Sequence, residues 1–135
     1  MNTKFESRQG KISLQEEKIF GFISDFNNFR QFIPQDKIND YQSSQEECSF
    51  SVPGAGMLKL KIVEKEPFSL LKIGGEGMGN QTFSFWIQLK KVEEMDTRVK
   101  LTLAADLNPV MKMMVAKPME QFLDKFVTAL ENIRM

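Results

Sequence analysis

The stretch NPVMKMMVAKPMEQFLDKFVTALENIRM, residues 108–135, decides the fold that we expect for this chain. Asn108 followed by Pro109 is typical of a helix start, because Asn caps free N–H groups and proline suits the first helical position. Apolar residues then recur at helical spacing on one face, which carries Met111, Val115, Met119, Phe122, Phe126, Leu130 and Ile133. Pro118 predicts a kink or a short helix restarting near Lys117. The apolar face indicates that this helix packs on an apolar layer.

A sheet is the layer that the preceding residues predict. From residue 37 onward, apolar and polar residues alternate with a period of two, most clearly over 82–89 and 98–105. Lys59, Lys61, Lys65 and Lys72 indicate a solvated outer face, while aliphatic residues occupy the other face. The glycines of the stretch 74–79 predict a hairpin between strands, and a second hypothesis places that hairpin beside a cavity mouth.

The first 34 residues predict one strand and two short helices. Residues 3–12 are extended in character and polar. Ser13 and Glu16 fit a capping box, which starts a helix at Leu14. Asn27-Asn28 offers a break and a new N-cap, and Pro34 stops the second helix.

Composition excludes several classes of function. The 135 residues suit one domain, 1–135, and their net charge of zero argues against a nucleic-acid partner. The chain has no histidine, which removes serine and cysteine triads and ordinary zinc or non-haem iron sites, so we expect no metal and no cofactor. The single cysteine, Cys48, and the lack of a long apolar run predict a cytoplasmic protein without a membrane-spanning segment.

Together these elements predict an α+β helix-grip fold. A curved antiparallel sheet of about six to seven strands wraps around the long C-terminal helix, with two short helices after the first strand. A curved sheet leaves a gap beneath such a helix unless large side chains fill it. The residues aimed there are mostly Phe and Met, of which the chain has twelve and nine.

Several segments resemble the START-like helix-grip (SRPBCC) superfamily, within it the small bacterial polyketide cyclase/dehydrase-like and lipid-transport-like members. Residues 14–34 match a helix, an Asp, a second short helix and an aromatic-x-Pro ending, with Asp25, Phe32 and Pro34 in those places. Residues 67–70, residues 97–99 and the terminal helix also match. The resemblance implies a deep, mostly apolar cavity between the sheet and the terminal helix. Members bind lipids, quinones, polyketides, hormones or aromatic compounds, and only some are enzymes.

We therefore expect the cavity to be lined by side chains from all three parts of the fold, namely Phe22, Phe26, Phe29, Leu60, Ile62, Ile73, Phe83, Phe85, Ile87, Leu101, Leu103, Met111, Met114, Val115, Met119 and Phe122. Methionine suits a variable apolar ligand, but it also fills gaps in ordinary cores. Both interpretations of the methionine cluster are open at this stage.

Two side chains are candidates for polar anchors, Glu64 and Tyr41. Glu64 shares the parity of Leu60 and Ile62, which predicts an inward carboxyl. The alternative is a strand that bulges and leaves Glu64 solvated, which the rarity of buried Glu favours. Trp86 has outward parity and is either partly covered by its neighbours or part of a homodimer contact.

Three functions follow from these residues. The first is a carrier or sensor that binds a small hydrophobic ligand. The second is a cyclase- or dehydrase-type enzyme in which Glu64 or Tyr41 moves a proton. The third is a protein-interaction module. The lack of convergent catalytic residues favours the first.

Overall fold

A computed structural model describes residues 2–33, 36, 38–52, 56–77 and 81–133. Its elements, in chain order, are β1 (Thr3–Glu6), β2 (Gly10–Ile12), α1 (Glu16–Ile23), the 3₁₀-helix η1 (Phe26–Phe32), β3 (Asn39–Ser43), β4 (Glu47–Val52), β5 (Gly56–Glu66), β6 (Leu70–Gly77), β7 (Gln81–Glu93), β8 (Asp96–Ala105) and α2 (Pro109–Glu131).

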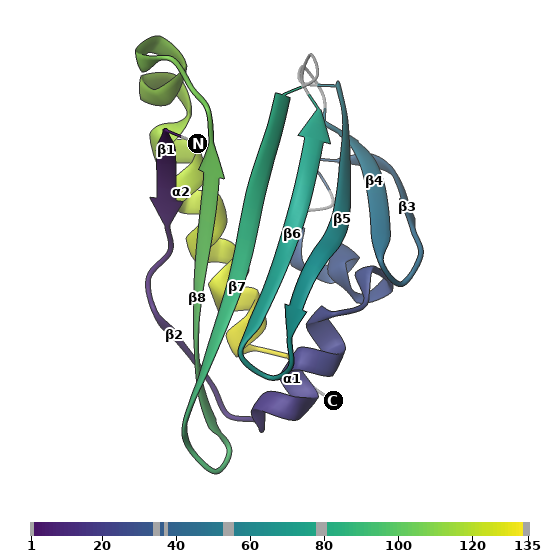
Figure 1. The fold of residues 1–135 in the computed structure, drawn as a ribbon, viewed down its shortest axis with the longest axis vertical. Coiled ribbons are helices and arrows are strands. Elements are labelled where there is room, and N and C mark those ends of the chain that lie inside the picture. Colours follow the sequence, from purple (N-terminus) through teal and green to yellow (C-terminus); the bar gives the residue numbers. More distant parts are fainter. Residues whose placement is uncertain (1, 34–35, 37, 53–55, 78–80, 134–135) are drawn as a thin grey trace.

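The strands form one antiparallel sheet in the order β1-β8-β7-β6-β5-β4-β3, with β2 paired to β8 beyond β1. The helices cover one face of this sheet, with α2 behind β8 and the two short helices toward β5 (Figure 1). We call this covered side the inner face and the opposite side the outer face. The arrangement confirms the expected α+β helix-grip fold.

The predicted opening strand is interrupted. Glu6 pairs with Thr102 and Gly10 with Val99, so three residues, 7–9, face only two on β8. The Ser7 N–H still donates to the Leu101 carbonyl at 2.9 Å. The extra residue bulges the chain and divides it into β1 and β2.

The predicted start of the first helix is wrong. α1 begins at Glu16, and its N-cap, Gln15, makes no side-chain capping bond. The Leu14 carbonyl instead accepts a hydrogen bond from the Thr97 hydroxyl at 2.9 Å, and Thr97 is fully buried. This contact with β8 holds Leu14 outside the helix.

The second short helix also begins earlier than predicted. Its N-cap is Asp25, whose carboxylate accepts from the Asn27 N–H at 2.9 Å, so η1 starts at Phe26 rather than after the two asparagines. The predicted stop at Pro34 lies outside the described residues.

The terminal helix starts as predicted. The Asn108 side chain accepts from the Met111 N–H at 2.8 Å, and Pro109 occupies the first turn. The helix continues through Pro118 without restarting near Lys117. All of its fully buried residues belong to its second half: Leu123, Phe126, Val127 and Leu130.

Candidate ligand-binding site

Aromatic rings close one end of the layer between the sheet and α2. The Phe126 ring of α2 lies 5.7 Å from the Phe29 ring and 5.3 Å from the Phe32 ring of η1, measured between centroids. It lies 5.7 Å from the Phe85 ring of β7. Phe26, at 4.6 Å from Phe29, completes the cluster. This end is filled with side chains, as in an ordinary core.

Toward the other end, the inner face of the sheet becomes exposed. Ile62 on β5 and Phe85 on β7 are 7% and 6% exposed. Leu60 and Phe83, two residues further along the same face of each strand, are only half-buried, although they still pack on the core. Leu58 continues this row. The sheet therefore presents apolar side chains that α2 does not cover.

The facing stripe of α2 changes in the same direction. Leu123 and Phe126 are buried, whereas Phe122, Met119 and Val115, one and two turns earlier, are half-buried. Near the helix start, Met113 and Met114 are 83% and 72% exposed. Both walls thus lose cover toward the same end, which leaves an apolar opening between them. We call it the apolar mouth, defined by Leu58, Leu60, Phe83, Val115, Met119 and Phe122.

Glycines in β6 shape the sheet side of the apolar mouth. A Cβ added to Gly75 would lie 2.2–2.7 Å from three ring carbons of Phe83. A Cβ on Gly77 would lie 2.4 Å from a Leu58 methyl carbon. Both neighbouring side chains therefore lie down across β6 instead of projecting toward α2. The prediction of a hairpin is wrong for residues 74–77, which belong to this strand.

The predicted lining residues fall into three groups. Nine belong to the buried core or its closed aromatic end: Phe26, Phe29, Ile62, Ile73, Phe85, Ile87, Leu101, Leu103 and, half-buried against them, Phe22. Leu60, Phe83, Val115, Met119 and Phe122 lie at the apolar mouth, and Met111 is half-buried one turn before Val115. Met114 differs, because it lies on the solvent side of α2. Sequence reasoning missed Leu58, although its alternation with Leu60 could have indicated it.

Glu64 does not point into the layer. The pairing of β5 with β6 shifts between Ile62 and Glu64, so the strand carries a bulge and Glu64 is exposed opposite Lys72. The expectation of an inward carboxyl is therefore wrong, and the solvated alternative is correct. Parity fails here because one extra residue reverses the faces of a strand.

Tyr41 connects β3 to η1. Its hydroxyl donates to the Phe26 carbonyl at 2.6 Å, and its ring stacks on Phe50 at 5.9 Å. Burial raises the pKa of Tyr41 well above its ordinary value, so the phenol keeps its proton at neutral pH. Burial also raises the pKa of the Cys48 thiol, to about 11, as expected of an unreactive core cysteine.

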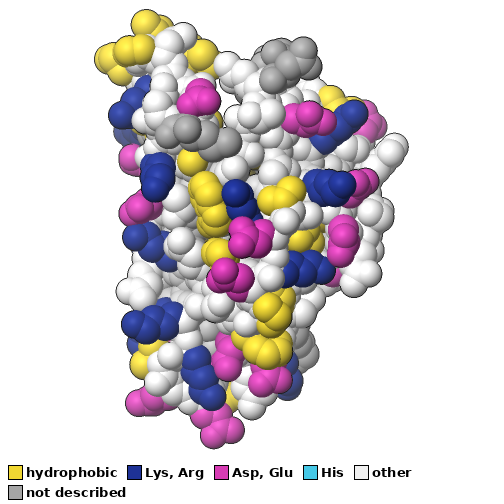
Figure 2. Space-filling view, in the orientation of Figure 1, with side chains coloured by type: hydrophobic (Ala, Val, Ile, Leu, Met, Phe, Trp, Pro, Cys, Tyr) yellow, Lys and Arg dark blue, Asp and Glu magenta, His cyan; other side chains and the backbone are white. Residues whose placement is uncertain are grey.

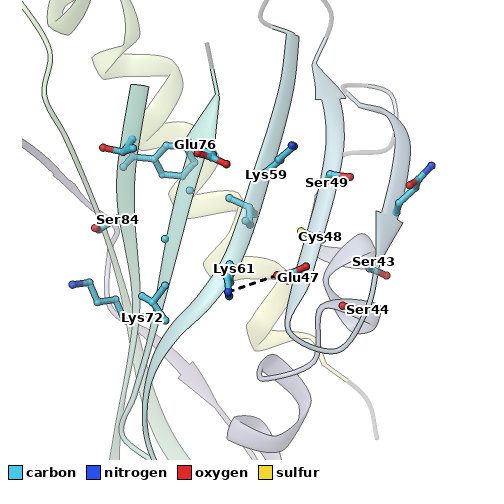
Figure 3. Close-up of a pocket in the computed structure, with 17 residues that line it drawn as sticks. Ser43, Ser44, Glu47, Cys48, Ser49, Lys59, Lys61, Lys72, Glu76 and Ser84 are labelled. Carbon is cyan, nitrogen blue, oxygen red and sulfur yellow. Dashed lines mark ion pairs between the residues drawn. The ribbon is translucent and has the colours of Figure 1, made fainter. Parts of the chain in front are cut away.

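A second hollow lies on the outer face of the sheet (Figure 3). It has a volume of about 810 Å³ and crosses β3 to β7. Its polar lining includes Ser43, Ser44, Glu47, Ser49, Lys59, Lys61, Lys72, Glu76, Thr82 and Ser84. We call it the outer groove. Side chains of both charges are interspersed over this side of the molecule (Figure 2).

The outer groove confirms the predicted lysine face only in part. Lys59, Lys61 and Lys65 are exposed, but Lys72 is half-buried and its Nζ lies 5.4 Å from the centre of the Trp86 ring. Trp86 has the predicted outward direction and is partly covered by this lysine. Sequence reasoning missed the groove, although Gly74 and Ser84 share the parity of these lysines.

The described residues offer little acid–base or metal chemistry inside the fold. Among them, no three His, Cys, Asp or Glu residues come close enough to hold a metal ion. The buried polar residues of the described part are all hydroxyl-bearing: Thr3, Ser7, Ser24, Ser84, Thr97 and Thr102. None of the helices in the described part is long and apolar enough to cross a membrane.

Solved structures of the same architecture define the class of the fold. A conserved protein from Geobacillus kaustophilus has a TM-score of 0.72 at 10% identity, over 95% of this chain and 91% of that one. A START superfamily protein from Mycobacterium smegmatis has a TM-score of 0.71 at 15% identity, over 95% and 94%. The Aha1 dimer from Colwellia psychrerythraea gives 0.66 at 17%, over 96% and 97%. The chain is thus a START-like helix-grip protein.

A family model identifies the chain more closely. Residues 9–134 match the model of the carbon monoxide dehydrogenase CoxG family. The chain belongs to this family, which confirms the resemblance to the SRPBCC superfamily. No curated protein sequence matches the chain.

Proposed function

We propose that this protein is a carrier or sensor that binds a small hydrophobic ligand at the apolar mouth. One observation carries the proposal: apolar side chains of the sheet and of α2 lose their cover toward the same end of the layer between them. Half-exposed apolar surface on two facing walls is stabilised when an apolar molecule removes it from water.

The chemistry of the walls supports a ligand of variable apolar shape. Met119 has a flexible thioether side chain, and Phe83 and Phe122 present aromatic rings. Each Å² of apolar surface removed from water contributes about 25 cal/mol. A ligand that covers about 200 Å² of these walls would therefore gain roughly 5 kcal/mol before the costs of association. A lipid, quinone, polyketide or aromatic compound fits this description.

Binding without turnover is favoured over the cyclase or dehydrase alternative. That alternative needs a group that moves a proton inside the layer. Glu64 is solvated, and the Tyr41 proton is donated to the Phe26 carbonyl. The proposal includes the cytoplasmic location expected from the sequence.

Self-association through Trp86 stays a prediction. The Lys72 ammonium covers part of the indole ring, and the rest of the ring is accessible on the outer face. Sedimentation equilibrium of the wild type and of Trp86→Ala tests it. A dimer that dissociates in the variant supports the contact, and identical masses exclude it.

The decisive variant for ligand binding is Met119→Trp, which places a larger side chain at the apolar mouth. We expect it to weaken binding of the neutral fluorescent probe N-phenyl-1-naphthylamine at least about tenfold, because the indole occupies the ligand volume. Native mass spectrometry of protein taken directly from cells, followed by organic extraction, should show a small molecule in the wild type and much less in the variant.

Met113→Trp is the matched control, since Met113 lies on the same helix but is 83% exposed. It should bind the probe as the wild type does. Circular dichroism verifies that both variants fold. Undiminished probe binding by a folded Met119→Trp protein would show that the apolar mouth is not the site.

A further inference from the structure

The register of the sheet places small and charged residues side by side on the floor of the outer groove. Lys61 on β5 pairs with Gly74 on β6, and Gly74 pairs with Ser84 on β7. Adjacent strands lie about 4.8 Å apart, and residues two apart on one strand are separated by about 7 Å. Lys72 and Glu76 are therefore the nearest neighbours of Gly74 along the outer face of β6 (Figure 3).

Gly74 leaves the backbone of a central strand uncovered. Glycine inside a strand costs stability relative to residues with a side chain, and it often marks a close approach by a ligand. Gly75 and Gly77 make room for Phe83 and Leu58, but Gly74 has no such neighbour. An added Cβ would meet only Val63, an exposed side chain, at 3.2 Å. Packing alone therefore does not require a glycine at this position.

Ser84 supplies an unused hydrogen-bonding group at the same place. Its side chain lines the outer groove although the residue is only 9% exposed. Its hydroxyl makes no hydrogen bond to any other described residue. A hydroxyl that is nine-tenths buried and faces a hollow is ready to donate to a bound molecule.

Positive charge gathers around this hydroxyl. Lys61 and Lys72 are diagonal neighbours across β5 and β6, where like charges repel one another. Lys61 has a carboxylate partner, Glu47, only at 3.8 Å, and Lys72 lies over the Trp86 ring. An anion between the two ammonium groups would remove their repulsion.

We propose that the outer groove is a second binding site, in which a carboxylate or phosphate group of a small polar molecule lies over Gly74. The Lys61 and Lys72 ammonium groups and the Ser84 hydroxyl donate to its oxygens, which gives charge-assisted hydrogen bonds. The Glu76 carboxylate, on the other side of Gly74, accepts from a hydroxyl or amine of the same molecule. The sheet separates this site from the apolar mouth, so the two sites are independent.

Titration with sodium phosphate and, separately, with sodium acetate tests the proposal. Amide shifts in ¹H–¹⁵N spectra are followed at constant ionic strength, adjusted with sodium chloride. We expect saturable shifts at Gly74 and Ser84, and the arm with the lower dissociation constant shows which anion the site prefers. Shifts that do not saturate with either salt, or that chloride alone reproduces, would overturn the proposal.

Ser84→Ala and Lys72→Met should each weaken binding of the preferred anion about tenfold, because each removes a hydrogen bond to a charged group. Lys90→Met is the matched control, since Lys90 is an exposed lysine on β7 outside the groove lining, and it should change affinity less than twofold. Equal affinity in Ser84→Ala, Lys72→Met and wild type would exclude the site. Binding of N-phenyl-1-naphthylamine should be unchanged in Ser84→Ala, so failure here is separable from failure of the apolar mouth.

Discussion

Gly75 shows how a single hydrogen atom in place of a side chain determines the space available at the apolar mouth. Phe83 lies across the glycine, and three of its ring carbons occupy the volume that a Cβ would need. The sequence pattern predicts this residue as part of a turn, yet its role is to let an aromatic ring lie flat on the sheet. The ring stays out of the layer only while residue 75 has no Cβ.

Gly75→Ala is therefore expected to lower the free energy of unfolding by about 1–3 kcal/mol, the usual cost of overpacking. Urea denaturation measures this change, and N-phenyl-1-naphthylamine binding should weaken as Phe83 is displaced toward α2. Gly21→Ala is the control, because nothing lies within 4 Å of its added Cβ and alanine favours a helix. It should stabilise the protein slightly. Equal stability of Gly75→Ala and wild type would contradict the role of Phe83.

Tyr41 has a structural role that its sequence position did not reveal. Its hydroxyl satisfies the Phe26 carbonyl at the start of η1, while its ring stacks on Phe50 of β4. Tyr41→Phe retains the ring and removes the hydrogen bond. We expect a loss of about 1 kcal/mol in the free energy of unfolding at pH 7, measured by urea denaturation.

The same variant should change the alkaline limb of stability. Because burial raises the pKa of Tyr41 above its ordinary value of 10.0, its contribution is complete below pH 10 and is lost as pH rises further. Tyr41→Phe should therefore lose less stability above pH 10 than the wild type does. A residual loss beginning near pH 9 is expected from Cys48, whose pKa is also raised. Parallel curves for both proteins would contradict this assignment.

At the scale of elements, α2 is attached by its second half. The Asp124 carboxylate accepts from the Arg8 N–H at 2.9 Å, and the Glu131 carboxylate accepts from the Lys11 N–H at 3.0 Å. The Arg8 guanidinium donates to Glu131 and to Thr128, both at 2.7 Å. Gly10 allows this approach, since an added Cβ would lie 2.4 Å from a Val127 methyl carbon. The bulge between β1 and β2 therefore fixes α2 to the sheet.

Glu131→Gln tests this attachment through the acid limb of stability. The hydrogen bond from Arg8, together with that from the Lys11 N–H, lowers the pKa of Glu131 below its ordinary value of 4.5. Its contribution is therefore complete above pH 4.5 and is lost as pH falls further. The variant should be less stable than the wild type by about 1 kcal/mol at pH 7 and flatter below pH 4.5 in urea denaturation.

Glu120→Gln is the matched control on the same helix, because Glu120 is exposed and makes none of these contacts. It should match the wild type at every pH. If Glu131→Gln retains the full acid dependence of the wild type, the carboxylate does not contribute in this way.

At the scale of the whole molecule, the sheet has two faces with different chemistry. The inner face carries the aromatic core and the apolar mouth, and the outer face carries the lysines and hydroxyls of the outer groove. β5, β6 and β7 contribute to both, because successive side chains of a strand point to opposite faces. One set of strands can therefore support an apolar site and a polar site without mixing their chemistry.

The sequence by itself determined the order of the elements, the antiparallel sheet and the apolar stripe of α2. These features depend on local periodicity, capping and turn residues, which act over a few neighbouring positions. It also indicated most side chains of the apolar mouth, since Phe83, Met119 and Phe122 follow directly from parity and helical spacing.

Only the tertiary structure decided where these local rules stop. The bulge after Ile62 turned Glu64 to solvent, and the bond between Thr97 and Leu14 displaced the start of α1. Cover on α2 ends where the sheet and η1 no longer reach it, which no helical period encodes. The unpartnered Ser84 hydroxyl likewise depends on neighbours from other strands. Such contacts join residues far apart in sequence, so their outcome is fixed only when the chain has folded.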